Sequence, residues 1–356
     1  MTQLTIPSRF YTDENHYDFD KRQIFYKSWQ FVGHVSQVAN RGDYFTTKIV
    51  DENILIAKGE DEKIRAFFNV CPHRAHSVAT GAGNRKLFVC PYHAWSYRLN
   101  GQLVRAPQAE NVDGFCKNDI KLREVQLETM LGLIFVNLDD NATSLKETYP
   151  GLEEGILSTR TGIENMKPVF ERDIEHSCNW KVSVENLNEC YHCPSVHATS
   201  ITQLYETESY SCDVYGPFMR HFIARKRDRD VHGDLHSWFI WPNNVVEVFP
   251  IHGAVSLRRV VPLGPSKTRY HYSWWVPEGL SEEATQEVVA VGTEYCNTVC
   301  REDAAVVACV QAGLESIGFD RGPLIVTSQA AEQSENAIAH FQTLYADTLK
   351  AAGEAL

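Results

Sequence analysis

The sequence predicts an α+β protein in which an N-terminal all-β domain precedes a larger domain of mixed strands and helices. Two observations support this prediction. Between about residues 36 and 141, short runs rich in β-branched and aromatic residues alternate with polar turns, as in antiparallel strands. Between residues 142 and 356, similar runs occur together with a long amphipathic stretch, which favours an α+β arrangement.

The individual elements follow from the same patterns. Residues 1–35 place aromatic side chains among charged ones, as in one or two amphipathic helices, and we expect this helical segment to pack on the larger domain. The strands expected in the β domain, 36–141, are 44–50, 53–57, 64–70, 87–89, 96–99 and 131–137. In the larger domain we expect one long helix over 281–317 and strands over 170–174, 215–226, 245–249, 254–261 and 268–276.

The composition excludes several classes of protein. The chain of 356 residues has a net charge of −12, which argues against nucleic acid as a partner because phosphates are neutralised by clustered Lys and Arg. No apolar run reaches the length of a membrane span. Ten unevenly spaced cysteines do not indicate a disulfide framework, and the N-terminal residues lack the features of a secretory signal, so we expect a cytoplasmic protein.

The stretch from residue 179 to 197 combines the start of a helix with side chains that can bind metal. Asn179 is a good N-cap residue, and the apolar positions after it predict a helix. If this helix continues, Glu185, Glu189 and His192 are spaced i, i+4 and i+7 and project from one side.

Two histidines stand at the end of this predicted helix. Pro194 is expected to stop the regular helix, so that His197 can turn back towards His192. With one carboxylate from elsewhere, two imidazoles form the two-His-one-carboxylate face of non-haem iron oxygenases. An isolated pair of histidines at this spacing is more often an ordinary helix end, so the stretch alone leaves both interpretations open.

A second group of metal-binding residues lies in two loops of the β domain. Each loop follows a predicted strand and pairs one Cys with one His: Cys71 with His73, and Cys90 with His93. Zinc could take two thiolates and two imidazoles, but zinc ligands usually come as Cys-Cys and His-His pairs. The mixed pairing suits a [2Fe–2S] cluster with both Cys on one iron and both His on the other.

The two loops, Cys-Pro-His-Arg-Ala-His from residue 71 and Cys-Pro-Tyr-His-Ala-Trp from residue 90, resemble the Rieske motif of the ring-hydroxylating oxygenase family, catalytic (alpha) subunit. The resemblance implies that Cys71, His73, Cys90 and His93 hold the cluster. It also implies that the larger domain is a catalytic domain, with a twisted antiparallel sheet flanked by helices and a mononuclear Fe(II) ion. Residues 179–197 match the family's iron motif, with His192 and His197 as iron ligands.

The third iron ligand has to come from a distant part of the chain, where Glu302 and Asp303 compete. Helical spacing favours Asp303, because it falls within an apolar stripe and Glu302 lies beside it. A carboxylate on a buried face needs a partner, which a metal ion would supply. The family pattern, including a Gln such as Gln311 further along the helix, points to the same residue. The apolar stripe consists of Cys296, Val299, Val306, Val307, Val310 and Leu314.

The resemblance gives Glu189 a different role. It implies that this carboxylate bridges the iron site to a Rieske histidine, His93, of the neighbouring subunit, within a homotrimer. It further implies a separate flavin and iron–sulfur reductase that draws electrons from NAD(P)H, and the chain has no Gly-x-Gly-x-x-Gly motif of its own. The family's reaction uses O2 and a small-molecule substrate.

Cys190 and Cys193 form a Cys-x-x-Cys spacing that also occurs in thioredoxin-like redox pairs. No strand precedes them and no βαβ pattern surrounds them. We therefore expect two buried thiols near the iron, without a redox role.

The substrate is the least constrained part of the prediction. An aromatic cluster in the expected pocket region could cage a quaternary ammonium group, hold an aromatic ring, or belong to the core. The cluster consists of Tyr215, Phe218, Trp238, Phe239, Trp241 and Phe249, of which Phe218, Trp238, Trp241 and Phe249 are the pocket candidates. The overall likeness favours carnitine and glycine-betaine type oxygenases, which implies N-demethylation or C–N cleavage. Hydroxylation or O-demethylation of an aromatic compound is the alternative, and an electron carrier without turnover is a remote one.

Overall fold

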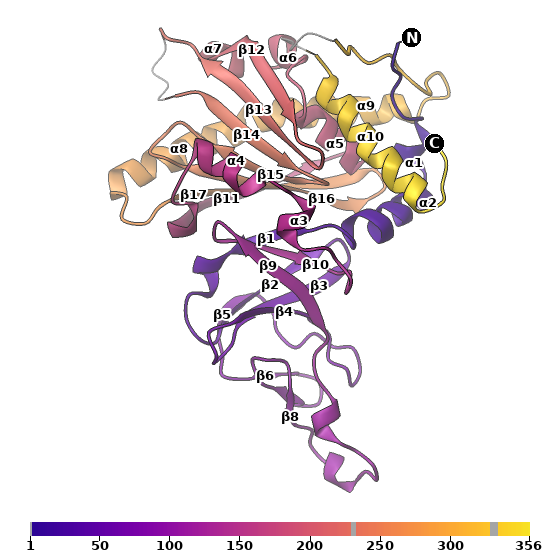
Figure 1. Cartoon of the computed structure of the whole chain (residues 1–356), viewed down its shortest axis with the longest axis vertical. Coiled ribbons are helices and arrows are strands. Elements are labelled where there is room, and N and C mark those ends of the chain that lie inside the picture. Colours follow the sequence, from indigo (N-terminus) through magenta and orange to yellow (C-terminus); the bar gives the residue numbers. More distant parts are fainter. Residues whose placement is uncertain (1, 229–232, 328–333) are drawn as a thin grey trace. The chain divides into compact units, whose positions relative to one another are not determined.

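The computed structural model describes residues 2–228, 233–327 and 334–356. The chain forms two compact units, one from residues 25–145 and one from residues 1–24 together with 146–356 (Figure 1). The first unit is all-β, and the second combines a curved antiparallel sheet with helices. The predicted α+β class is confirmed.

The β unit is built on a seven-stranded antiparallel sheet in the order β1-β10-β9-β4-β3-β2-β5, with a small sheet β6-β7-β8 beside it. Apolar residues pack on both faces of this sheet in two clusters, so consecutive residues of several strands are buried. The bounds are β1 Gln30–His34, β2 Asp43–Ile49, β3 Glu52–Lys58, β4 Ile64–Phe68, β5 Ala82–Asn84, β6 Phe88–Val89, β7 Ser96–Tyr97, β8 Leu103–Arg105, β9 Glu124–Met130 and β10 Leu133–Asn137.

The N-terminal boundary of the β unit lies earlier than residue 36. Strand β1 falls inside the segment 1–35 that was expected to be helical, and it pairs with β10. Because every residue of β1 is buried, its polar ends Gln30 and His34 do not produce the alternation by which an exposed strand is recognised. The pattern of apolar and polar residues therefore does not predict this strand.

The larger unit contains a second seven-stranded antiparallel sheet in the order β11-β17-β16-β15-β14-β13-β12. Its strands are β11 Met166–His176, β12 Tyr205–Val214, β13 Phe218–Arg225, β14 Leu235–Ile240, β15 Asn244–Val248, β16 Val255–Gly264 and β17 Lys267–Pro277. Strands β12 and β14 were not predicted, because charged residues and a short apolar run mask their alternation.

Helices pack on this sheet and position the functional residues. Helix α5 packs against β16 and β17, α8 against β11 and β17, and α9 against β11 and α5 (Figure 1). The helices are α1 Arg9–Thr12, α2 Glu14–Phe19, α3 Leu145–Thr148, α4 Leu152–Thr159, α5 Trp180–Leu187, α6 Cys193–Val196, α7 Ile201–Leu204, α8 Glu282–Asn297, α9 Val299–Leu314 and α10 Asn336–Ala351. The helix predicted over 281–317 is thus divided at Thr298 into α8 and α9. Among the described residues, no helix is long and apolar enough to cross a membrane.

Helix α5 begins where the sequence predicts and ends earlier. The side chain of Asn179 accepts a hydrogen bond from the backbone N–H of Lys181, which confirms the predicted N-cap. The helix ends at Leu187, so Glu189 and His192 do not continue it, and the predicted i, i+4, i+7 face is wrong. Glu185 lies apart from both and is not among the residues that line the cavity described below.

A fully buried ion pair fixes α5 to the N-terminal segment of the same unit. Lys181 pairs with Asp20, and the indole N–H of Trp180 donates to the same carboxylate at 2.7 Å. The ammonium also lies 4.8 Å from the centre of the Tyr345 ring on α10. Breaking a buried pair by removing one partner is strongly destabilising, so this contact holds the start of α5 in place.

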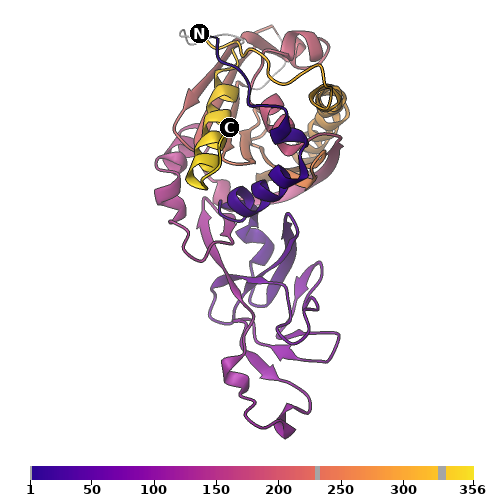
Figure 2. The same ribbon diagram turned by 90° about the vertical axis from the view of Figure 1, so that its right-hand side faces the viewer.

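The middle of α5 is held by a second carboxylate, that of Glu185, which is only partly exposed. Glu185 accepts hydrogen bonds from the Tyr11 hydroxyl at 2.7 Å and from Gln342 at 2.8 Å. The N-terminal segment and α10 therefore meet at α5 (Figure 2). Burial raises the pKa of Glu185 to about 7, although both hydrogen bonds oppose the shift.

This raised pKa predicts how stability changes with pH. In the unfolded chain the carboxyl has a pKa of about 4.3, so the folded protein holds the proton more tightly. Its stabilising effect is full below that pKa and is lost as the pH rises to about 7. From this group alone, the free energy of unfolding falls by roughly 2 to 3 kcal/mol between pH 5 and pH 8.

We expect Glu185→Gln, which cannot titrate, to lose this dependence. Relative to wild type, the variant should gain roughly 2 to 3 kcal/mol between pH 5 and pH 8, measured by urea denaturation at both pH values. Glu175→Gln is the matched control, because Glu175 is exposed and pairs with Lys267 on the sheet surface. The same stability difference at both pH values for Glu185→Gln would contradict the prediction.

Candidate metal centre and cavity

Two histidines flank a single helical turn that follows α5. Helix α6 occupies Cys193–Val196, with His192 before it and His197 after it. Pro194 lies in the first turn of α6, where the missing N–H costs nothing, so it begins a helix and does not stop one as predicted. The short helix brings the two imidazoles together with their Nε2 atoms 3.1 Å apart.

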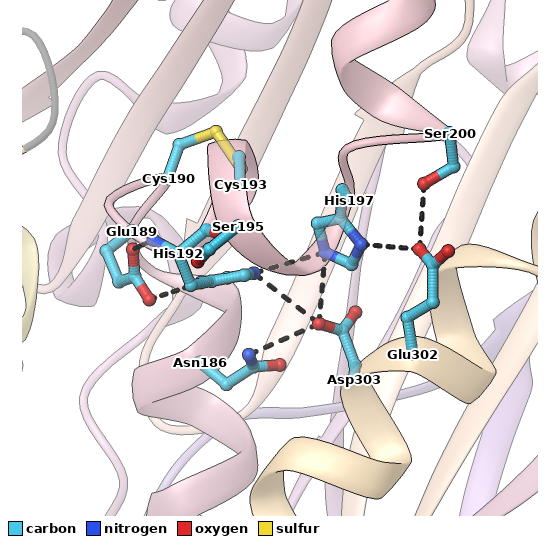
Figure 3. A network of polar contacts seen from close by, with 10 residues as sticks. All are labelled: Asn186, Glu189, Cys190, His192, Cys193, Ser195, His197, Ser200, Glu302 and Asp303. Atoms are coloured by element: carbon cyan, nitrogen blue, oxygen red, sulfur yellow. Dashed lines mark hydrogen bonds and ion pairs between the residues drawn. A yellow bond between two sulfur atoms is a disulfide. The ribbon is translucent and has the colours of Figure 1, made fainter.

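Asp303 completes a group of three donors. One carboxylate oxygen lies 3.1 Å from His197 Nε2 and 3.5 Å from His192 Nε2 (Figure 3). The three ligand atoms lie within 4.8 Å of one another. The structure thus brings together the three residues that the sequence singled out, from the two ends of α6 and from α9 directly after its first turn.

Surrounding side chains orient all three donors. Glu302 accepts from His197 Nδ1 at 2.7 Å and from the Ser200 hydroxyl, and Glu189 bonds His192 Nδ1 (Figure 3). With each Nδ1–H donated to a carboxylate, both Nε2 atoms keep a lone pair for a cation. Glu302, which the sequence left as the alternative third ligand, therefore contacts His197 at Nδ1, the nitrogen that does not face Asp303. This position follows from the fold and not from the sequence pattern.

The geometry of this group suits a metal ion. Burial opposes the charged form of His192, but its hydrogen bonds to the carboxylates of Asp303 and Glu189 outweigh it and raise the pKa of His192 to about 10. Asp303 is partly buried, which opposes its charged form, but the same imidazoles hold its pKa well below the usual range. Two Nε2 atoms and one carboxylate oxygen at contact distance are the donor set of a non-haem ferrous site.

A cavity opens at the three donors and extends to the sheet. Besides His192, His197 and Asp303 it is lined by Asn186, Leu187, Glu189, Cys190, Cys193, Ile201, Tyr210, His221, Ile223, Leu235, Ser237, Val245, Glu247, Arg258, Tyr270, Tyr272, Tyr295 and Val299. Helices α5 to α9 and the residues between them supply one side, and strands β12 to β17 supply the other. The cavity therefore gives a small molecule access to the metal centre.

The four aromatic pocket candidates do not line this cavity, which corrects the prediction. Phe218 and Trp238 belong to a cluster with Tyr215, Trp241 packs near Trp180 and Phe341, and Phe249 packs on Trp274. For Phe218 and Trp238 the physical reason is strand parity: His221 and Ser237 face the cavity, so side chains an odd number of residues away on the same strands point to the opposite face.

Four tyrosines take the place of the predicted aromatic residues. Tyr270 and Tyr272 are two residues apart on β17 and share the cavity face; Tyr210 and Tyr295 come from β12 and α8. The alternation Tyr-His-Tyr in the sequence was the available signal for the first two. No local signal pointed to Tyr210 or Tyr295.

The Cys-x-x-Cys pair also differs from expectation. Cys190 and Cys193 are joined by a disulfide, where two free thiols were predicted (Figure 3). The turn from residue 190 into α6 brings their Cα atoms to 4.9 Å, within the range that a disulfide spans. The other eight cysteines are unpaired.

The two loops of the β unit have matching backbone geometry. In each loop the Cys carbonyl accepts from an Ala N–H four residues later, at 2.9 Å for Ala75 and 3.0 Å for Ala94, and both alanines have positive φ. The Cys N–H in turn donates to the carbonyl of the residue five positions later, at 2.8 Å both for Cys71 to His76 and for Cys90 to Trp95. Cys71 and Cys90 therefore occupy equivalent positions in their loops, whereas His73 follows its Cys by two residues and His93 by three.

The side chains of these loops converge and suit a cluster. Cys71 and Cys90 are buried, and the rings of His73 and His93 lie 4.6 Å apart, centre to centre. His93 Nδ1 is buried and has no hydrogen-bond partner in the described part of the chain. The Tyr97 hydroxyl lies 3.0 Å from the Cys71 sulfur. A buried nitrogen without a partner beside buried thiols fits ligation of a [2Fe–2S] cluster.

Comparison with known protein families assigns both units. Residues 28–116 match the Rieske [2Fe-2S] domain, and residues 163–238 and 220–351 match the catalytic domain of the ring-hydroxylating alpha subunit. The chain is 34% identical to the carnitine monooxygenase oxygenase subunit of Escherichia coli (strain K12), over 97% of this chain and 94% of the relative. It is 29% identical to the chloroplastic choline monooxygenase of Arabidopsis thaliana, over 97% of this chain and 83% of that protein.

Solved structures show the same relationship. The quaternary ammonium Rieske monooxygenase CntA in complex with L-carnitine superposes with a TM-score of 0.88 and 31% identity, over 98% of this chain and 96% of that one. Its complex with gamma-butyrobetaine gives a TM-score of 0.86 and 32% identity over the same shares. The chain therefore belongs to the Rieske-type ring-hydroxylating oxygenase family, as a catalytic alpha subunit with both a Rieske domain and a catalytic domain.

Proposed function

We propose that the protein is the terminal oxygenase of a multicomponent system and hydroxylates a quaternary ammonium compound at a carbon bonded to its nitrogen. The observation that carries this proposal is the group of His192, His197 and Asp303 at the end of a cavity. Relatives that match over nearly the whole chain are named carnitine and choline monooxygenases, which supports the substrate class.

The three donors would bind the metal ion, and the carboxylates that accept from the two histidines would fix the orientation and tautomer of each ring. A ferrous ion with two His ligands and one carboxylate keeps open positions for O2 beside the substrate. Glu302 and Glu189 fix the tautomers of His197 and His192, so that each ring offers Nε2 to the metal. Asn186 donates to Asp303 at 3.2 Å and helps to fix the carboxylate.

The cavity also favours a cation. Three carboxylates, those of Glu189, Glu247 and Asp303, line it against one guanidinium, that of Arg258. Hydroxylation of an N-methyl group would give an unstable carbinolamine that releases formaldehyde, with one O2, two electrons and two protons consumed and one water formed. Hydroxylation of a methylene next to nitrogen would cleave the C–N bond.

Electrons would come from outside the chain. Cys71, His73, Cys90 and His93 would hold the [2Fe–2S] cluster, which a separate flavin and iron–sulfur reductase reduces at the expense of NAD(P)H. Glu189 would connect the Rieske histidine His93 of a neighbouring subunit to the iron site within a homotrimer. Its hydrogen bond to His192 supports one half of this bridge. Eight unpaired cysteines favour a cytoplasmic location.

A single turnover tests the proposal. Chemically reduced, iron-replete protein would be exposed to O2 with a pool of carnitine, gamma-butyrobetaine, choline, glycine betaine and aromatic acids, and the products read by mass spectrometry and a formaldehyde assay. A demethylated amine with formaldehyde, or a released tertiary amine, is expected. A hydroxylated or O-demethylated aromatic product would contradict the proposal.

Removing the carboxylate ligand should remove one iron. We expect Asp303→Ala to contain about two iron atoms per chain where wild type contains about three, with an unchanged visible spectrum of the cluster. Asp347→Ala is the control, because Asp347 is an exposed aspartate on α10. Iron analysis and absorption spectroscopy measure both quantities. Retention of all the iron by Asp303→Ala would exclude Asp303 as a ligand.

The bridging role of Glu189 can be separated from its hold on His192. Glu189→Gln keeps an oxygen that accepts from His192 Nδ1 and removes the charge, so we expect full iron content with product formation lowered roughly 10- to 100-fold. Glu206→Gln, an exposed glutamate on β12, is the control. Turnover of Glu189→Gln at the wild-type rate with reductase would rule out the proposed role.

A further inference from the structure

The cavity face of the sheet carries a row of polar side chains on neighbouring strands. His221 on β13 pairs directly with Ser237 on β14, and Ser237 pairs with Glu247 on β15. Glu247 pairs with Ser256 on β16, and Arg258, two residues further along β16, pairs with Tyr272 on β17. Directly paired residues point to the same face of a sheet, and all of these except Ser256 line the cavity.

Two of these residues form a buried ion pair. Glu247 and Arg258 are in contact, with side chains 5% and 7% exposed. The centres of the Tyr272 and Tyr295 rings lie 5.2 and 5.0 Å from the guanidinium carbon. Because a buried pair adds little stability over apolar residues of the same size, its presence in a cavity wall indicates a role in binding.

The pair leaves hydrogen-bonding capacity that faces the cavity. A guanidinium has five N–H groups, and in the described part of the chain Glu247 and the Ser256 hydroxyl, at 3.4 Å, account for only part of them. His221 Nε2 is also buried without a hydrogen-bond partner among the described residues. Unpaired buried polar atoms of this kind are costly unless a ligand or water satisfies them.

Charge is distributed unevenly along the cavity. Asp303 and Glu189 lie at the metal centre, and Arg258 supplies the positive charge on the sheet side. Tyr270 and Tyr295 line the same cavity, and the centre of the Tyr295 ring lies 5.0 Å from the guanidinium carbon of Arg258. A substrate whose cationic nitrogen lies near the metal would direct its other end towards Arg258.

We propose that Arg258 binds the carboxylate of a zwitterionic quaternary ammonium substrate, and that Glu247 is a positioning residue that holds the guanidinium in the cavity wall. The proposal rests on the proposed function and narrows its substrate class. It selects betaines, which carry a carboxylate, over choline-like compounds that end in a hydroxyl. The guanidinium donates to Glu247 from one edge and would donate to the substrate carboxylate from its remaining N–H groups.

Binding of a matched pair of ligands tests the proposal. Isothermal titration calorimetry would compare gamma-butyrobetaine with its carboxamide, which has the same shape and no carboxylate charge, using iron-replete protein under anaerobic conditions. The double variant Glu247→Gln, Arg258→Met removes both charges together and so avoids a lone buried carboxylate. Arg220→Met is the control, because Arg220 lies on the same sheet, is 3.9 Å from Asp213 and does not line the cavity.

We expect wild type and Arg220→Met to bind gamma-butyrobetaine more tightly than the carboxamide. The double variant should bind gamma-butyrobetaine about 10- to 100-fold more weakly and the carboxamide unchanged. Equal loss for both ligands, or no loss for either, would overturn the role of Arg258 and leave the proposed function standing. Wild-type protein that binds neither ligand would contradict both.

Discussion

The structure depends on the convergence of three donors that no single element could supply. Two imidazole nitrogens 3.1 Å apart, with a carboxylate oxygen 3.1 and 3.5 Å from them, form an arrangement that a cation stabilises. The single turn of α6 sets the distance between the histidines, and the break between α8 and α9 at Thr298 brings the N-terminal part of α9 beside them. The remainder of the catalytic unit fixes these pieces relative to one another.

Buried charges fix the pieces, and each is compensated locally. Asp20 and Lys181 hold the start of α5, Glu302 holds His197, and Glu189 holds His192. Such pairs contribute more to a defined geometry than to stability, since apolar residues would stabilise a core equally well. Buried charged pairs are therefore found where the position of a metal-binding side chain has to be fixed. The pair of Glu247 and Arg258 follows the same logic on the opposite wall of the cavity.

The sequence predicted features that depend on local chemistry. The two Cys-His loops and the N-cap at Asn179 have residue types and spacings that carry information by themselves. The residues of the metal centre could be chosen only together with the family resemblance. The α+β class was likewise accessible, because strand and helix periodicities differ.

Features that depend on register and on helix ends were missed. Whether Trp238 or Ser237 faces the cavity depends on the pairing of β13, β14 and β15, and β14 itself was not recognised. The end of α5 at Leu187 moved Glu189 off the predicted face, and the following turn brought Cys190 and Cys193 into a disulfide. Each error concerns a contact between residues whose relation is set by tertiary structure, which a one-dimensional pattern does not contain.

The most direct measurement locates the substrate relative to the metal. Pulsed electron paramagnetic resonance of the ferrous protein treated with nitric oxide detects deuterons close to the iron, so gamma-butyrobetaine deuterated at the N-methyl groups can be compared with the same compound deuterated next to the carboxylate. Because the cationic nitrogen is placed near the metal and the carboxylate at Arg258, we expect strong deuterium coupling from the N-methyl groups and weak coupling from the carboxylate end. The reverse order, or no coupling from either, would contradict it.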